Sequence, residues 1–472
     1  MNIIEQVSSI IKEKEEVFIQ VSDRIWELAE TRFEEYQSAE VLCEVLQQEG
    51  FQVERGVGGI ETAFLASFGS GAPVIAILGE FDALSGMSQR AGVCHPEALE
   101  HGGNGHGCGH NLLGVGALAA AVAVKEILKE SKLAGTVRYY GCPGEEGGSG
   151  KTFMVREGLF ENVDVALTWH PGSHNSVSTG SSLANYQVHY RFTGKSAHAA
   201  ISPHLGRSAL DAVELMNVGV NYLREHITTQ ARVHYAVTNT GGNSPNVVQS
   251  EAEVLYLIRA PKVQQVEEIY HRINDIAKGA AMMTGTEVAI IFDKACSNLL
   301  PNVTLNRVMH GKFEQLGVPQ HSKEEQELAK EIRRTLSEAD KQNDTRADVS
   351  LIGKDLASHL EPFQENEISM SGSTDVGDVS WVVPTAQCEV VCYALGTPYH
   401  SWQMVAQGRT SFSHKGMLHA GKVIALTTLE LLTKPELIEE AKLEWKERHE
   451  GVAYVCPIPP DVLPSPLSKK SK

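Results

Sequence analysis

The sequence lacks long uncharged apolar runs and an excess of basic residues. No apolar run without charge reaches the roughly 18 residues typical of a membrane-spanning helix, so we expect no transmembrane segment. Lys and Arg number 41 against 59 Asp and Glu, which gives a formal net charge of −18. Nucleic acids and anionic membranes attract basic faces, and this balance argues against both as partners. The negative net charge is more compatible with small or cationic partners.

Cysteine is sparse and irregularly spaced. The eight cysteines form no short repeating pattern, and Met1–Gln6 leads into a Glu-rich amphipathic segment without a basic region. We therefore expect no secretory signal, reduced thiols and a cytoplasmic location. Cys388 and Cys392 lie in an apolar run and are expected to be buried packing residues. Cys108 differs from these packing cysteines, because its neighbours in the sequence are glycine and histidine residues.

The chain does have the length and apolar content for more than one core. Its 472 residues are 42% hydrophobic and 21% charged, as in soluble globular proteins of two or more domains. After helical spacing up to about residue 50, apolar strands alternate with helices. The expected strands are 74–78, 136–140, 163–169 and 388–395, and a helix is expected at 112–128. This alternation predicts an α/β catalytic domain, a mixed sheet with helices on both faces.

Residues 185–297 show a different order of elements. Strands are expected at 186–192, 232–240, 253–259 and 287–292, with helices at 208–225 and 263–283. This βαββαβ order is ferredoxin-like and long enough for a separate domain. We therefore expect 185–297 to be inserted into a catalytic domain made of 1–184 and 298–434. Residues 435–472 are charged, Pro-rich and Lys-terminated, which predicts a surface or partly disordered tail.

Residues with metal-ligand or acid/base chemistry follow four apolar strands. In chain order they are Glu80 and Asp82, Glu145 and Glu146, His170, and His400. Because ligands bind beyond the carboxyl ends of strands in open α/β sheets, we expect these residues to converge on one crevice. Cys108 and His110, on a glycine turn before a helix, would add a thiolate and an imidazole. Each motif alone is more often incidental, but their joint placement favours a metal site.

The adjacent carboxylates Glu145 and Glu146 need different roles, since consecutive side chains diverge. One can bind a metal while the other takes a proton from metal-bound water, whose pKa a divalent ion lowers to about 7. The surrounding run 144–152 looks like a phosphate-binding loop. However, five residues rather than four separate Gly144 from Gly150, and two carboxylates would repel phosphate. We therefore exclude nucleotide binding.

Several runs of sequence resemble the metal-dependent aminoacylase/carboxypeptidase family, in its auxin-conjugate hydrolase branch. They are Gly105–Asn111, Pro143–Gly148, Trp169–Pro171, Gly194–Ala200 and Gly241–Asn246, with Gly79–Leu84, Ser373–Trp381 and His400–Gln403 narrowing the match within that branch. The resemblance extends to about residue 432. It implies two divalent ions, manganese or zinc. The implied ligands are Cys108, His110, Glu146, His170 and His400, with Glu145 as general base.

The resemblance also assigns roles around these ligands. His400 is preferred to His414 as the last ligand, because His400 directly follows the fourth apolar strand. Much of the family has His-x-Asp where this chain has Glu80-Phe81-Asp82, so Asp82 would orient a ligand and Cys108 could bridge both metals.

The small domain of the family usually dimerises and contributes to the active site of the partner subunit. His198 matches the histidine that polarises the scissile carbonyl. Asn246 and Arg259 match the residues that hold the substrate carboxylate, for which the planar guanidinium is suited.

The sequence therefore predicts a metal-dependent amidohydrolase that acts through metal-bound hydroxide. Its substrate would be a small amide in which an acyl or aroyl group is joined to an amino acid or dipeptide with a free carboxylate. Two alternatives stay open: a dipeptidase of the same fold, and a non-catalytic regulatory or assembly subunit. We expect a homodimer or a heterodimer with a related subunit.

Overall fold

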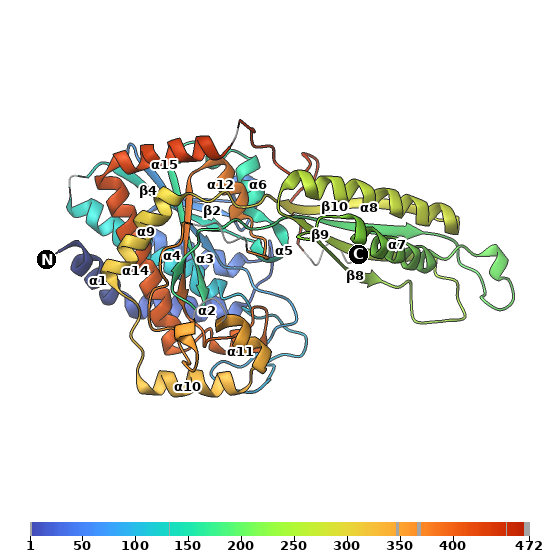
Figure 1. The fold of residues 1–472 in the computed structure, drawn as a ribbon, viewed down its shortest axis with the longest axis horizontal. Helices are drawn as coiled ribbons and strands as arrows, with labels where there is room; N and C mark the ends of the chain where they lie inside the picture. The colour runs from blue at the N-terminus through green and yellow to red at the C-terminus, as the bar shows by residue number, and fades with distance from the viewer. Residues whose placement is uncertain (1, 132, 346–348, 366–369, 450, 467–472) are drawn as a thin grey trace.

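Two β-sheets organise the chain in the computed structural model, which describes residues 2–131, 133–345, 349–365, 370–449 and 451–466. The first sheet has seven strands in the order β1-β2-β4-β3-β5-β11-β6. Its strands are β1 (Gln52–Arg55), β2 (Phe64–Ser70), β3 (Val74–Glu80), β4 (Gly135–Cys142), β5 (Val165–Gly172), β6 (Ser176–Val177) and β11 (Thr385–Val391). Figure 1 shows this sheet within a broad body, from which the second sheet extends as a narrower arm.

The first sheet is mixed, as the sequence predicts. Strands β4, β3, β5 and β11 are consecutive neighbours and all parallel, whereas β1, β2 and β6 pair antiparallel with their neighbours. The four parallel strands are those that the sequence marks by their apolar runs. Their carboxyl ends therefore lie along one edge, where the polar residues that follow them can meet.

Helices cover both faces of this sheet because its strands are apolar on both sides. One face packs against α4 (His110–Glu130), α9 (Val303–Leu316) and α14 (Ser411–Thr433), with α1 (Ile3–Glu13), α2 (Glu15–Leu28) and α3 (Tyr36–Gln48) alongside. The other face packs against α6 (Gly150–Arg156) and α12 (Val376–Val382). On β3, Ile75 and Ile77 belong to the first core and Ala76 and Leu78 to the second, which follows the alternation of a strand.

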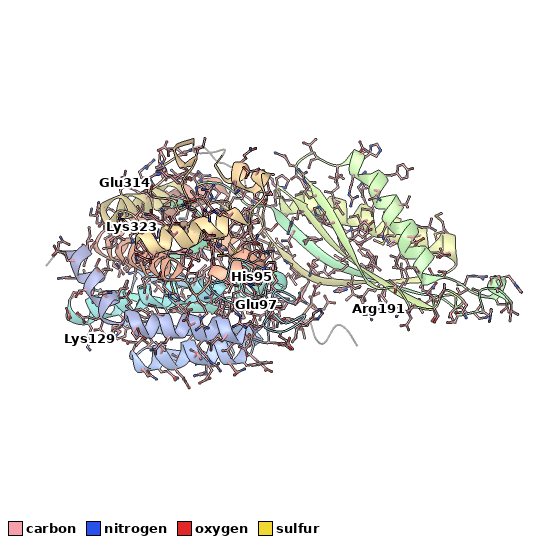
Figure 2. All side chains as sticks on the ribbon, turned by 90° about the horizontal axis from the view of Figure 1, so that it is seen from below. His95, Glu97, Lys129, Arg191, Glu314 and Lys323 are labelled. Carbon is pink, nitrogen blue, oxygen red and sulfur yellow. The ribbon has the colours of Figure 1, made fainter. Side chains whose placement is uncertain are left out.

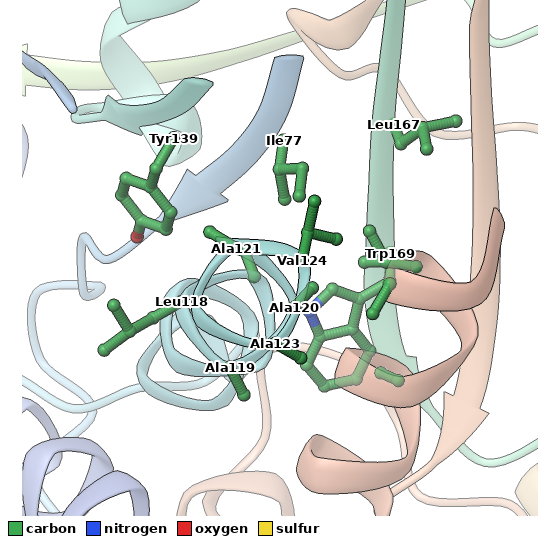
Figure 3. Close-up of a cluster of buried hydrophobic side chains, with 14 of the residues drawn as sticks. Ile77, Leu118, Ala119, Ala120, Ala121, Ala123, Val124, Tyr139, Leu167 and Trp169 are labelled. Carbon is green, nitrogen blue, oxygen red and sulfur yellow. The ribbon is translucent and has the colours of Figure 1, made fainter. Parts of the chain in front are cut away.

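Helix α4 is the central helix of the body. Figure 3 shows Ala121 and Val124 of this helix beneath Ile77, and Ala120 and Ala123 beside Trp169. By length and composition α4 could cross a membrane, but 94% of its most apolar stretch is buried inside the protein. Small side chains such as Ala120 let the helix approach the sheet closely, which explains its apolar composition.

The second sheet forms the arm and has the predicted βαββαβ order. Its strands β7 (Ala184–Thr193), β8 (Arg232–Asn239), β9 (Glu251–Ala260) and β10 (Glu287–Cys296) are antiparallel in the order β10-β7-β9-β8. Helices α7 (Ala209–Leu223) and α8 (Val263–Thr284) cover one of its faces. In Figure 2, Arg191 of β7 lies on this arm, far from Glu314 and Lys323 on the body.

Other elements differ from the expectations. The sequence analysis did not identify β1, β2 or β6, and β11 ends at Val391. The expected tail begins with α15 (Pro435–Arg448), whose Ile438 is buried. Farther along, Ile458 is also buried and the Tyr454 hydroxyl donates to Asp378. This packing differs from a surface tail, while residues 467–472 lie outside the described part. The remaining helices are α5 (Glu145–Gly148), α10 (Lys323–Arg334), α11 (Glu338–Thr345) and α13 (Trp402–Gln407), with short 3-10 turns at Val57–Gly59, Pro203–Leu205, Arg224–His226 and Val349–Leu351.

Candidate metal centre and substrate pocket

Cys108 belongs to two groups of potential metal ligands beyond the parallel strands. The first group is Cys108, His110 and His170, and the second is Cys108, Glu146 and His400; in each, the ligand atoms lie within 4.8 Å of one another. Cys108 Sγ is 3.4 Å from His170 Nε2, and His400 Nε2 is 3.2 Å from Glu146 Oε1. The predicted ligands therefore meet in one place, with the thiol common to both groups.

Backbone conformation brings these side chains together. Gly109 has φ +79° in the turn before α4, and a Cβ there would meet the Tyr393 hydroxyl at 2.0 Å. Only glycine fits this turn, which lets Cys108 and His110 face the same point. His400 also has a positive φ, 57°, and its backbone N–H donates to Gly107 O at 2.9 Å. A left-handed histidine is uncommon and indicates a constrained position.

Asp82 contacts one residue of each ligand group. Its Oδ1 lies 2.9 Å from His110 Nδ1, and its Oδ2 accepts the backbone N–H of Glu146 at 2.8 Å. The carboxylate therefore leaves His110 Nε2 facing the centre. This is the placement expected of a residue that orients a metal ligand.

Glu80 is held by Lys151, a contact that the sequence analysis missed. Lys151 is fully buried; its Nζ lies 2.8 Å from Glu80 Oε1 and also pairs with Asp375. Although Glu80 is close enough to His110 and Glu145 to form a third potential ligand group, the ammonium group neutralises one of its oxygens. The sequence did offer one sign of this contact, because Lys151 lies at the end of the glycine-rich run 144–152, for which phosphate binding was excluded.

Glu145 lies at the start of α5, in a loop fixed from both sides. Glu35 Oε1 accepts the N–H of Gly144 at 2.9 Å, and the Arg32 guanidinium donates to Gly147 O. Burial, together with the charges of Glu80 and Glu146, raises the pKa of Glu145 well above its usual range. A carboxyl group with a raised pKa can both accept and release a proton near neutral pH.

The electrostatics of the ligand groups fit a cation. Burial and the charge of Glu146 raise the pKa of the Cys108 thiol well above its usual value, so a thiolate there requires a positive partner. Burial and the charge of His110 lower the pKa of His170 to about 4, which keeps this imidazole neutral and able to ligate. The buried Nε2 of His110 makes no hydrogen bond with a described residue and lies 3.2 Å from Glu80 Oε2. Thiolate, imidazole and carboxylate together are a donor set for zinc or a related divalent ion.

A cavity of about 570 Å³ lies between these ligands and the arm. Cys108, Glu145 and His400 line one side, and Asn185 and Arg259 of the second sheet line the other. Burial lowers the pKa of Arg259, and its Nε has no hydrogen-bond partner among the described residues. The volume is that of a small-molecule site.

His198 and Asn246 lie apart from both this cavity and the groups of potential ligands. Ala199 donates its N–H to Asn246 O, so the loops that carry His198 and Asn246 adjoin each other, and both residues are exposed. Both loops lie at the end of the arm where β9 begins. The start of β9 is eight residues before Arg259, which corresponds to roughly 26 Å along a strand. Within one chain, the structure does not bring them to the predicted metal ligands.

His414, the alternative to His400, also lies elsewhere. It is on α14, and its Nε2 is 2.9 Å from Asp23 Oδ1 on α2. It belongs to neither group of ligands that contains Cys108.

An α/β body, an inserted arm and a ligand-rich pocket between them define a hydrolase of the metallopeptidase class. The chain belongs to peptidase family M20/M25/M40, whose model matches residues 76–361. It is 52% identical to the B subunit of the p-aminobenzoyl-glutamate hydrolase of Escherichia coli, over 98% of both chains. The predicted resemblance to this family of metal-dependent hydrolases is therefore confirmed.

Three further proteins are similar to this chain at lower sequence identity. The Xaa-Arg dipeptidase of Mus musculus is 28% identical over 90% of this chain and 88% of its own. The A subunit of the Escherichia coli p-aminobenzoyl-glutamate hydrolase is 29% identical over 48% of this chain and 54% of its own. The crystal structure of an aminobenzoyl-glutamate utilization protein from Klebsiella pneumoniae has a TM-score of 0.59 and 16% identity, and the match covers 89% of this chain and 98% of that one. This structural match supports the fold.

Proposed function

We propose that this protein is a metal-dependent amidohydrolase that releases an amino acid from an N-acyl or N-aroyl amino acid, such as p-aminobenzoyl-glutamate. The observation that carries the proposal is the position of Cys108 in both ligand groups, with Glu145 lining the same pocket. The identity of 52% to one subunit of a p-aminobenzoyl-glutamate hydrolase supports the choice of substrate.

Five side chains would hold two divalent ions, manganese or zinc. Cys108, His110 and His170 would bind one, and Cys108, Glu146 and His400 the other. Bound there, the ions would activate water and polarise the substrate carbonyl. Asp82 keeps His110 in the tautomer that directs Nε2 inward, because its carboxylate accepts the proton on Nδ1.

Glu145 is the proton carrier of the proposed reaction. Its carboxylate takes a proton from the attacking water, whose oxygen forms a bond to the amide carbon. Glu145 then delivers this proton to the amide nitrogen as the C–N bond breaks, which yields a carboxylic acid and a free amine. Arg259 binds the substrate carboxylate from the arm side of the pocket.

A second polypeptide chain completes the proposed site. His198 and Asn246 lie at the far end of the arm, too far to reach the pocket of their own chain. We propose that a partner, either a second copy or a related chain, supplies these two residues, with His198 stabilising the developing oxyanion. The two Escherichia coli relatives named as different subunits of one hydrolase support a related partner. We also propose a cytoplasmic location, which the eight free cysteines support.

Metal analysis combined with a substrate panel tests this proposal. The panel contains N-aroyl amino acids, N-acyl amino acids and unblocked dipeptides, including Xaa-Arg peptides because one relative is named for them. We expect bound divalent metal and hydrolysis of the blocked amino acids. Faster cleavage of unblocked dipeptides would favour the dipeptidase alternative, and bound metal without any hydrolysis would favour the non-catalytic subunit.

The Glu145→Gln variant tests the proton carrier. It should retain the metals, since Glu145 belongs to neither ligand group that contains Cys108, yet it should lose at least about 100-fold in kcat. Glu161→Gln, at a surface position of the same body, is the matched control. An unimpaired rate in Glu145→Gln would contradict the assignment.

A further inference from the structure

A β-bulge in the arm turns Lys294 toward the substrate pocket. The pairing of β10 with β7 shifts by one residue between Phe292 and Lys294. Without this shift, Lys294 would pair with Tyr186, whose side chain packs in the core beneath the helices. With it, Lys294 pairs with Gln187, which lines the pocket. Bulges commonly re-aim a side chain in this way near functional sites.

Lys294 is a buried lysine without a partner. It is 8% exposed, yet it forms no ion pair or hydrogen bond with any residue in the described part of the chain. The acid beside it, Asp293, is already held by Arg32 at 3.1 and 3.2 Å and by Gln187 at 2.7 Å. The side chain of Lys294 is largely buried and lines the cavity. A charged group withdrawn from most of the solvent normally has an anionic or hydrogen-bonding partner, so this unpaired ammonium group indicates an anionic ligand in the cavity.

Arg259 is a second cation on the same side of this pocket. It pairs with Asn185 on β7, and Asn185 pairs in turn with Cys296 on β10, two residues beyond Lys294. Two strand spacings and two residues along a strand separate the Cα atoms of Lys294 and Arg259 by roughly 12 Å. Both side chains are long and line the same cavity, so their cationic ends can contact one ligand at two points.

We propose that Lys294 binds a second carboxylate of the substrate and selects N-acyl amino acids with an acidic side chain, such as glutamate or aspartate. This inference rests on the proposed function, in which Arg259 binds the α-carboxylate. A cationic side chain would meet Lys294 at close range, so the pocket disfavours substrates that end in Arg or Lys. A neutral side chain would leave the ammonium group unpaired in the pocket, at the cost of a lost charged interaction.

The test compares N-aroyl-glutamate with N-aroyl-glutamine, which has nearly the same shape but a neutral side chain. Both are assayed with the metal-loaded enzyme in its native assembly, as wild type and as Lys294→Met. The wild type should favour the glutamate substrate by roughly 10- to 100-fold in kcat/KM, as expected for one charged hydrogen bond. In Lys294→Met this preference should fall to about threefold or less, mainly through a higher KM for the glutamate substrate.

Two further variants separate specificity from a structural effect. Lys294→Arg keeps the charge and should retain most of the preference. Lys278→Met removes an exposed lysine of α8 that pairs with Asp275, and it should leave the preference unchanged. Thermal unfolding of each variant shows whether it remains folded.

Different results of these assays would contradict the role of Lys294 and the proposed function. Equal losses on both substrates in Lys294→Met, or a wild type that does not distinguish them, would overturn the role of Lys294 while leaving the proposed amidohydrolase intact. Wild-type enzyme that hydrolyses neither substrate nor any other blocked amino acid would overturn the proposed function itself.

Discussion

The imidazole of His110 and the carboxylate of Asp82 lie 2.9 Å apart, Nδ1 to Oδ1, and both are buried. The second oxygen of Asp82 accepts the backbone N–H of Glu146 at 2.8 Å. One carboxylate therefore fixes a residue from each group of proposed metal ligands. These two contacts are the ones that the proposed role of Asp82 in orienting a ligand requires.

Asp82→Ala should weaken metal binding without removing a ligand. Loss of a residue that orients a ligand typically lowers metal affinity by about 10- to 100-fold. Competition with a chromophoric chelator measures this affinity, and Asp275→Ala on the exposed face of α8 is the control. Unchanged affinity in Asp82→Ala would show that Asp82 does not orient His110.

Lys151→Met should destabilise the body strongly. Lys151 is fully buried between Glu80 and Asp375, so its removal leaves two carboxylates in the core without the cation that they share. Breaking a buried pair in this way typically costs about 3–5 kcal/mol of unfolding free energy. Urea unfolding of the metal-free protein measures the change. The control, Lys129→Met near the end of α4, should stay within about 0.5 kcal/mol of wild type, and a similarly small change in Lys151→Met would refute the argument.

His400→Ala and His414→Ala distinguish the two candidates for the last ligand. We expect His400→Ala to lose one metal ion per chain and nearly all activity. His414→Ala should keep both metals and most of its activity, because His414 pairs with Asp23 outside the pocket. Metal analysis and kinetics on both variants decide this point. Retained metal and full activity in His400→Ala would contradict the assignment of His400 as the last ligand.

Stability should fall in mild acid because of His419. Burial lowers the pKa of His419 in the folded protein to about 4, although its Nε2 lies 2.8 Å from Gly317 O. The unfolded chain binds this proton near pH 6.5, so the contribution is complete above about 6.5 and is lost as the pH falls toward 4. The loss should approach roughly 3 kcal/mol.

Urea unfolding of the metal-free protein between pH 7 and 4.5 measures this contribution. His419→Gln keeps a donor for Gly317 O but cannot titrate, and it should show a shallower pH dependence than wild type. Parallel curves for the two proteins would contradict the prediction.

The sequence predicted the elements with the strongest periodicity. The four parallel strands and the βαββαβ arm were recognised because their apolar runs are continuous or alternate regularly. Strands β1 and β2 were missed: β1 has only four residues, mostly exposed, and the alternation of β2 is weak. Their positions depend on pairing with β4, which is a tertiary effect.

The proposed ligands were predictable because each follows a strand or a glycine turn. Lys151 and Lys294 were not, since one depends on burial against distant acids and the other on a β-bulge that no spacing reveals. His198 and Asn246 were identified by resemblance alone. Their distance from the pocket within one chain could be seen only once the length and direction of the arm were known.

Metal content of Cys108→Ala tests the central claim most directly, because Cys108 is the one residue common to both groups of proposed ligands. Cys94→Ala, in the long loop between β3 and α4, is the matched control. We predict two divalent ions per chain in the wild type and the control, and loss of both ions together with activity in Cys108→Ala. Two ions and normal turnover in Cys108→Ala would contradict a centre built on a shared thiolate.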